Sequence, residues 1–320
     1  MKFSNRFELP GPLVTALTGE LYDMKNPPEN VISVTGLIKP PKQKILESRH
    51  DNEIEVDASE RLWLLLGTAC HFVVEQAAGY EHITEKRWFM DCSTGKAFEV
   101  EDGSVTEQVW YDPKTIYVTG KLDLYDPMEK KLSDYKITSV WSWVLEKTIK
   151  KEHDAQLQIN ALAMRQLGHN VEKLSVLMLF RDWSKTKSKN DYPDLEVPMK
   201  EVFAPLWNDK EIMDYIDGRV RMHYEARRKT DDEIAECTPE ERWTKATKYA
   251  VMKAGKKRAE RVYDQKPEPD FLTKNHPGCT VTERPGVDTK CTDYCNANAF
   301  CHYWKAKYGT SVEPTTTEEY

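Results

Sequence analysis

The chain has 320 residues, and 46 Lys and Arg against 53 Asp and Glu give it a net charge of −7. This length allows one large domain or a core with appended segments, and the negative charge excludes bulk attraction to nucleic acid, so any DNA path must be a local basic groove. No apolar run approaches the roughly 20 residues that span a membrane, and the first ten residues lack the apolar stretch of a signal peptide. We therefore expect a cytoplasmic protein whose seven cysteines are ligands or free thiols rather than disulfides.

The first chemically suggestive element is an apolar helix after Asp57. Residues 1–55 are rich in proline and are predicted to pack as an N-terminal segment. A capping residue followed by an apolar run predicts a buried helix. His71 and Glu75 are four residues apart and share one of its faces. A lone histidine on an apolar helix is most often a core residue, so spacing alone does not make His71 a ligand.

The next elements are β-rich. Residues 85–91 and 97–101 are predicted to form a pair of strands, and residues 115–138 read as two further β-rich runs around a polar connector with proline, which is a hairpin signal. Asp123 falls in the first of these runs. Asp134 and Lys136 fall in the second, where a spacing of two puts them on one face. Two carboxylates and a lysine at neighbouring strands can hold a divalent metal and an activated water.

A helix over residues 153–168 follows, with Gly168 as its C-terminal cap. Gln156 lies in its first turn, and Asn160 follows one turn later. The pattern then predicts a buried strand at 172–183 and a long amphipathic helix at 205–229.

The C-terminal part is rich in cysteine. Cys-x3-Cys-x5-Cys spans eleven residues, and three close thiols need a fourth ligand for a tetrahedral or cubane site. Cys237 is preferred as the fourth ligand, and Cys279 is the alternative. Cys237 lies farther away in the sequence, but the entropic cost of closing a loop rises only slowly with its length. Thiolates suit zinc as well as iron. The three thiols of the motif belong to Cys291, Cys295 and Cys301.

These motifs, in this order, resemble those of the PD-(D/E)XK nuclease superfamily, and in particular its RecB-like exonucleases, including CRISPR-associated and phage enzymes. Gly67-x-x-x-His71-x-x-x-Glu75 is similar to the first motif, and Gly120-x-x-Asp123 followed by Asp134-x-Lys136 is similar to the metal site. Gln156 matches the Gln-x-x-x-Tyr motif, whose tyrosine is replaced here by Asn160. The resemblance covers residues 60–305.

The resemblance implies an α/β fold with a restriction-endonuclease-like core, in which a mixed central sheet is flanked by helices. It implies Mg²⁺ or Mn²⁺ bound by His71, Asp123 and Asp134 with the backbone carbonyl of Tyr135. The catalytic residues would be Asp123, Asp134, Lys136 and Gln156. Lys136 would orient the attacking water and stabilise the charge that builds on the phosphate.

The resemblance also implies a [4Fe-4S] cluster on Cys237, Cys291, Cys295 and Cys301, with Zn²⁺ as the alternative metal. One residue more in the first gap of the cysteine motif departs from the family pattern. Beside the cluster, the basic residues Lys253, Lys256, Lys257 and Arg258 are expected to contact DNA.

The expected organisation is an N-terminal segment (1–55), a nuclease core (56–235), a cysteine-cluster segment (236–305) and a disordered tail (306–320). The expected function is a metal-dependent deoxyribonuclease, an exonuclease of DNA processing or recombination. Its substrate would be DNA with a free end or single-stranded DNA, and its partner a helicase or recombination protein. We expect no association with a membrane, and a location in the host cytoplasm if the protein is phage-encoded. Two alternatives stay open: a DNA-end-binding module or partner subunit with weak turnover, and a zinc-dependent RNA-binding protein.

Overall fold

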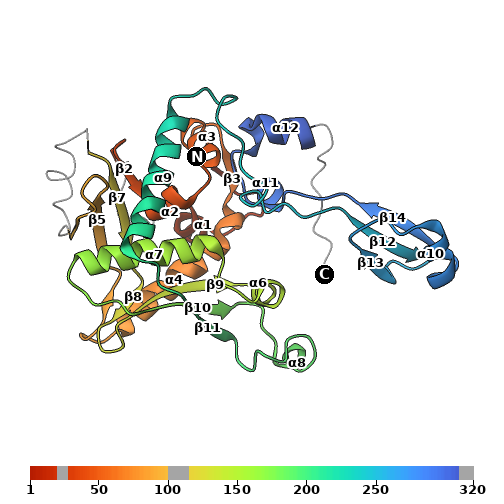
Figure 1. Ribbon diagram of the computed structural model, residues 1–320, viewed down its shortest axis with the longest axis horizontal. Helices are drawn as coiled ribbons and strands as arrows, with labels where there is room; N and C mark the ends of the chain where they lie inside the picture. The colour runs from red at the N-terminus through yellow and green to blue at the C-terminus, as the bar shows by residue number, and fades with distance from the viewer. Residues whose placement is uncertain (20–27, 100–114, 310–320) are drawn as a thin grey trace. The chain divides into compact units, whose positions relative to one another are not determined.

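A computed structural model describes residues 1–19, 28–99 and 115–309 of the chain (Figure 1). The chain divides into two compact units. The first unit comprises Met1–Lys39 and Glu55–Glu225, and the second comprises Pro40–Ile54 and Ala226–Tyr320. The predicted N-terminal segment, 1–55, is therefore not a unit of its own, because its first 39 residues belong with the core and the next 15 belong with the C-terminal part.

The first unit is mixed α/β, as the sequence predicts. Its strands, in chain order, are β1 (Lys2–Ser4), β2 (Val31–Ser33), β3 (Glu55–Asp57), β4 (Ile83–Thr84), β5 (Arg87–Asp91), β6 (Ala97–Glu99), β7 (Tyr117–Lys121), β8 (Leu124–Asp126), β9 (Lys131–Thr138), β10 (Lys173–Phe180) and β11 (Met199–Ala204). Its helices are α1 (Gly11–Thr18), α2 (Val34–Ile38), η1 (Ala58–Arg61), α4 (Leu62–Ala77), α6 (Val140–Glu146), α7 (Lys151–Gln166), α8 (Lys185–Ser188) and α9 (Asp209–Arg227).

Two mixed sheets carry the first unit. One has the strand order β11-β10-β9-β8-β4, in which β9 and β10 are parallel and the other pairs are antiparallel. The other has the order β2-β7-β5-β6, in which only β2 and β7 are parallel. The parallel β9–β10 pair is joined through α6 and α7, the crossover that parallel neighbours require.

Helix α7 packs against both sheets (Figure 1). Leu157 and Ala161 join the core over β9 and β10, and the next residues round the helix, Ile159 and Leu162, join a second core with Trp88 of β5. This double burial explains why nine of the sixteen residues of α7 are buried. The residues at its N-terminal end are thereby fixed against β9.

Two expectations about local structure are wrong. Asp123 does not lie in a strand: it occupies a bend between β7 and β8, which belong to different sheets, and the hairpin consists of β8 and β9 only. The apolar run after Asp57 does form α4, with Asp57 capping the preceding η1, but no residue of α4 is buried. Hydropathy alone therefore misjudged the surroundings of this helix.

Gly120 marks the closest approach between β7 and its neighbours. A Cβ atom there would lie 2.4 Å from Trp88 Cζ2 and 2.8 Å from Asn160 Oδ1, and these two side chains share a hydrogen bond of 3.1 Å. Asn160, at the position where the resemblance leads one to expect tyrosine, therefore serves the core beneath β7.

Gly120→Ala is expected to destabilise the protein by about 1–3 kcal/mol, because the added methyl group overlaps the buried indole. The measurement is urea unfolding. Gly218→Ala is the control: Gly218 lies within α9 with open space around it, so alanine should stabilise by up to about 1 kcal/mol. Equal stability of the two variants would contradict the crowding at Gly120.

The second unit holds the cysteine-rich segment. Its elements are α3 (Pro41–Arg49), β12 (Lys248–Lys253), β13 (Arg261–Tyr263), α10 (Pro269–Asn275), β14 (Cys279–Arg284), α11 (Thr289–Asp293), η2 (Asn298–Phe300) and α12 (His302–Tyr308). The three strands form an antiparallel sheet of order β13-β12-β14. Because α12 extends to Tyr308, the predicted tail boundary at 306 falls inside a helix, and residues 310–320 lie outside the described part of the chain.

Helix α3 belongs to this unit through specific contacts. Lys42 Nζ donates to the carbonyl of Ile234 at 3.0 Å, and Arg49 pairs with Asp231 at 2.6 Å. The His50 ring stacks on Phe300 with 3.9 Å between ring centroids. These contacts explain why residues 40–54 leave the N-terminal segment to which the sequence assigns them. In the described residues of both units, no helix combines the length and the apolarity needed to cross a membrane.

Candidate metal centre

Three side chains of the first unit converge on a point that could hold a metal ion. One ligand atom each from His71, Glu85 and Asp123 lies within 4.8 Å of the other two. His71 Nδ1 is 3.4 Å from Glu85 Oε1 and 3.4 Å from Asp123 Oδ1. One imidazole and two carboxylates form a donor set that suits divalent transition metals and, through its oxygens, Mg²⁺.

The local fold places each of the three donors. His71 projects from α4 and meets the edge of the Tyr135 ring, with 6.0 Å between centroids. Glu85 precedes β5 in a left-handed conformation, with φ of 50°. Asp123 lies in the bend after β7, where its Oδ2 accepts a 2.8 Å hydrogen bond from the backbone N–H of Tyr135. The bend and the left-handed residue turn two carboxylates out of their strands toward the helix.

The charges of this group favour a bound cation. Hydrogen bonds to Asp123 and then to Glu85 raise the pKa of His71 to about 10, so without a metal the imidazole holds a proton at neutral pH. Burial raises the pKa of Glu85, but hydrogen bonds from His71 and Lys121 outweigh burial and hold it below its ordinary value. A metal ion would replace the proton of His71 and meet the same two carboxylates.

Asp134 and Lys136 form a second, more buried pair beside this group. Lys136 Nζ lies 2.6 Å from Asp134 Oδ2 and 3.4 Å from Oε1 of Gln156. Burial, opposed by Lys136 and assisted by Asp123, raises the pKa of Asp134 to about 6. Burial lowers the pKa of Lys136, but the charges of Asp134 and Asp123 outweigh it and raise the pKa, so Lys136 is a cation at neutral pH.

The structure thus brings the residues predicted from sequence together in two adjoining sets. His71 and Asp123 share the three-donor group, whereas Asp134 lies outside it and is paired with Lys136 and Gln156. The two sets interact electrostatically, since Asp123 and His71 both act on the pKa of Asp134. Among the described residues, Asp134 Oδ1 is buried without a hydrogen-bond partner, and such a buried polar atom is costly.

Two residues of this region escaped the sequence analysis. Glu85 occupies the third place of the donor group, and no motif marks it, because only the left-handed turn before β5 directs it to His71. His153 lies three residues before Gln156 on α7, and its Nδ1 is buried with no hydrogen-bond partner in the part of the chain that the structure describes. Burial and the positive charge of Lys136 lower the pKa of His153 to about 3, so this imidazole is neutral.

The second unit contains five of the seven cysteines, and four of them are the predicted cluster ligands. Burial is the main cause that raises the pKa of Cys237 to about 12, and the thiols of Cys291, Cys295 and Cys301 contribute after Glu241. The four thiols therefore influence one another electrostatically, but no three of these described residues bring their sulfur atoms within 4.8 Å of one another. Cys279 lies elsewhere in the unit, on β14, where its thiol donates to Glu260 at 3.4 Å.

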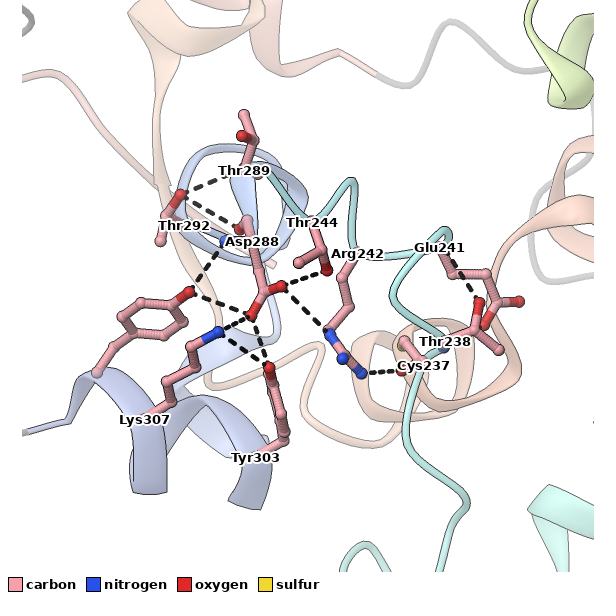
Figure 2. A network of polar contacts seen from close by, with 11 residues as sticks. Cys237, Thr238, Glu241, Arg242, Thr244, Asp288, Thr289, Thr292, Tyr303 and Lys307 are labelled. Carbon is pink, nitrogen blue, oxygen red and sulfur yellow. Dashed lines mark hydrogen bonds and ion pairs between the residues drawn. The ribbon is translucent and has the colours of Figure 1, made fainter. Parts of the chain in front are cut away.

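A buried carboxylate holds together the segments that carry these thiols. Figure 2 shows Asp288 accepting hydrogen bonds from Thr244, Tyr303 and Lys307, at 2.5, 2.7 and 2.8 Å. Its backbone carbonyl accepts from the N–H of Cys291 at 2.9 Å.

Arg242 extends this network to the fourth cysteine. Its Nε lies 3.5 Å from Asp288 Oδ1, and its Nη1 donates to the carbonyl of Cys237 (Figure 2). Burial raises the pKa of Asp288, but hydrogen bonds from Lys307 and its neighbours more than offset this and hold the pKa well below the ordinary range. The permanent negative charge of Asp288 fixes the backbone around Cys237 and Cys291.

The four basic residues predicted to contact DNA are all exposed. Lys253 ends β12, and the others occupy the turn before β13, in which Gly255 has a φ of 74°. They form a compact positive loop in the second unit.

Comparison with known proteins adds little to this description. A solved structure described as "Crystal structure of SSO0001" is similar over 66% of this chain and 84% of its own, with 18% sequence identity and a TM-score of 0.41. No protein-family model matches the chain, and no curated protein does. The geometry of the two units therefore carries the functional argument.

Proposed function

We propose that the chain is a divalent-metal-dependent DNA nuclease with a PD-(D/E)XK-type core, acting as an exonuclease of the RecB-like kind. The observation that carries this proposal is the convergence of His71, Glu85 and Asp123 within 4.8 Å, directly beside a buried carboxylate–lysine pair. A metal-ligating group and a buried cation, adjacent to each other, are what hydrolysis of a phosphodiester needs.

Each residue has a distinct task in this proposal. A bound Mg²⁺ or Mn²⁺ supplies a water of lowered pKa and offsets the charge of the phosphate. His71, Glu85 and Asp123 would hold it, with Asp123 oriented by the N–H of Tyr135.

On the other side of the site, Asp134 keeps Lys136 charged and in place, and Gln156 limits its remaining freedom. The ammonium group can then orient the attacking water and stabilise the charge that develops on the phosphate oxygens. Asp134 Oδ1, which has no hydrogen-bond partner among the described residues, would be available to the metal as well.

We propose further that Cys237, Cys291, Cys295 and Cys301 bind a [4Fe-4S] cluster, with a zinc ion as the alternative. The electrostatic influence of three of these thiols on Cys237 and the Asp288 network that links their segments support this choice of ligands. This group would stabilise the second unit and take no part in hydrolysis. The exposed loop from Lys253 to Arg258 offers the local positive charge that a DNA path needs in a chain of net charge −7.

The test is cleavage of end-labelled linear DNA and of closed circular DNA in Mg²⁺ or Mn²⁺, with the wild type and Asp134→Asn. The amide of asparagine has the shape of the Asp134 carboxylate but carries no negative charge. Loss of linear DNA alone, dependent on metal and absent in the variant, is the expected result.

Other outcomes point to other functions. Cleavage of circles would make the enzyme an endonuclease at the same site. Folded, metal-loaded protein that binds DNA ends without cleaving them would favour a binding module. Zinc in place of iron, together with preference for RNA, would favour an RNA-binding protein.

A further inference from the structure

Within the described residues of the first unit, helix α4 exposes an apolar surface. Of its sixteen residues none is buried, although most are apolar. Trp63 and Phe72 are each 59% exposed, and Val73 is 63% exposed. Isolated exposed apolar residues are ordinary, but so many on one helix mark an interaction surface.

The exposed residues follow a helix-pairing pattern. Leu62, Leu66, Ala69 and Val73 are all exposed and are separated by four, three and four residues, the spacing of the seam along which two helices pack. His71, which faces the metal centre, is on the opposite side of the helix from this seam. The seam therefore points away from the donor group.

The face of the sheet on which α4 lies also exposes apolar side chains beside the helix. The ladder aligns Tyr135 with Leu177 and Glu201, so these side chains share one face of the sheet. That face is the one that α4 covers, because the ring of His71 contacts the ring of Tyr135. Met199 and Phe203, two residues to either side of Glu201, are on this face and are 41% and 58% exposed.

We propose that this surface is the interface of a homodimer, in which the α4 seam packs against α4 of a second copy of the chain. The exposed parts of the seam, of Trp63 and Phe72 beside it, and of Met199 and Phe203 amount to an apolar area on the order of 700 Å². One partner in a stable interface contributes roughly 800 Å².

The scarcity of charged residues along the helix favours a second copy of the chain as the partner. No Asp, Glu, Lys or Arg occurs between Leu62 and Val74, so two copies related by a twofold axis meet without repulsion. A nucleic acid would need cations to meet its phosphates, and the helix between Leu62 and Val74 has no Lys or Arg. The ring of Trp63 is already covered by the Arg181 guanidinium, 4.3 Å from its centroid. An aliphatic seam without charge fits a second aliphatic seam.

The test is the oligomeric state of the full chain, measured by sedimentation and by light scattering after gel filtration, from about 1 to 100 µM. The wild type is expected to be a dimer. Leu66→Glu and Val73→Glu are each expected to raise the dimer dissociation constant at least about 100-fold, because each places two like charges at the twofold interface. Met128→Glu is the matched control, since Met128 is 85% exposed in the β8–β9 turn and its variant should remain dimeric.

Several results would overturn the proposal. They are a monomeric wild type at about 100 µM, and a dimer that both glutamate variants leave intact. A monomer whose binding to oligo(dT) is lost in Leu66→Glu would overturn it in favour of a nucleic-acid surface. Leu66 and Val73 are exposed in the single chain, so the variants should fold, and circular dichroism checks this. The readout does not depend on nuclease activity, so the proposed function and the dimer can fail separately.

Discussion

Replacement of Lys136 by methionine is expected to lower the rate of DNA cleavage by roughly 10²- to 10³-fold while leaving DNA affinity unchanged. Methionine retains most of the apolar stem and removes the ammonium group that lies 2.6 Å from Asp134. The lost interaction is one that strengthens only as charge builds on the phosphate, so its removal lowers the rate and not the binding.

The measurements are single-turnover cleavage of linear DNA in Mg²⁺ and, for affinity, fluorescence anisotropy in Ca²⁺. Lys131→Met is the matched control. Lys131 lies on the same strand, its side chain is 23% exposed like that of Lys136, and it pairs with Glu201 on the opposite face of the sheet. Its variant should cleave at the wild-type rate.

Two results would count against the site. Full activity of Lys136→Met would show that Lys136 takes no part in the reaction. It would also contradict a site that combines the three-donor group with the Asp134–Lys136 pair. A loss shared equally by both lysine variants would point to damage of the sheet instead of the chemistry. Because Asp134 loses its buried partner, the unfolding temperature of Lys136→Met should be compared with that of the wild type.

The sequence predicts the parts of this site that depend on period and order. The spacing of two between Asp134 and Lys136 places both on one face of β9, as observed. The amphipathic run that contains Gln156 forms α7, and the second turn of this helix brings Gln156 to Lys136 of β9, as the motif order suggests. The spacing of apolar and polar residues along a helix or strand depends on the local sequence, so these elements can be predicted without a structure.

The parts that sequence could not supply are set by tertiary geometry. Glu85 joins the donor group only because a left-handed residue breaks the approach to β5. Asp123 was expected in a strand and lies in a bend between two sheets, which no local pattern distinguishes from a continuous hairpin. Helix α4 was expected to be buried, but none of its residues is. An apolar sequence indicates that a helix face is covered, but it does not say whether the same chain or another chain covers it.

The second large effect is expected from Cys237→Ser, compared with Cys279→Ser as its matched control. Protein purified without oxygen should contain about four iron atoms per chain if the four thiols hold a cubane cluster. Cys237→Ser should lose at least about nine-tenths of this metal, because serine is a poor ligand for a thiolate-bound metal. Cys279→Ser should retain it, because the Cys279 thiol is engaged with Glu260 and lies apart from the other four.

Stability gives a second reading of the same comparison. Metal binding contributes directly to the folding of the segment that holds it, so Cys237→Ser should lower the unfolding temperature of the second unit, and Cys279→Ser should not. The Arg242 bond to the carbonyl of Cys237 and the Asp288 network beyond it hold this residue in place (Figure 2). Zinc in place of iron would change the metal and keep the ligand set. Loss of the metal in Cys279→Ser and its retention in Cys237→Ser would contradict the proposed ligand set. The same result would also contradict the idea that the Asp288 network positions Cys237 and Cys291 for one metal group.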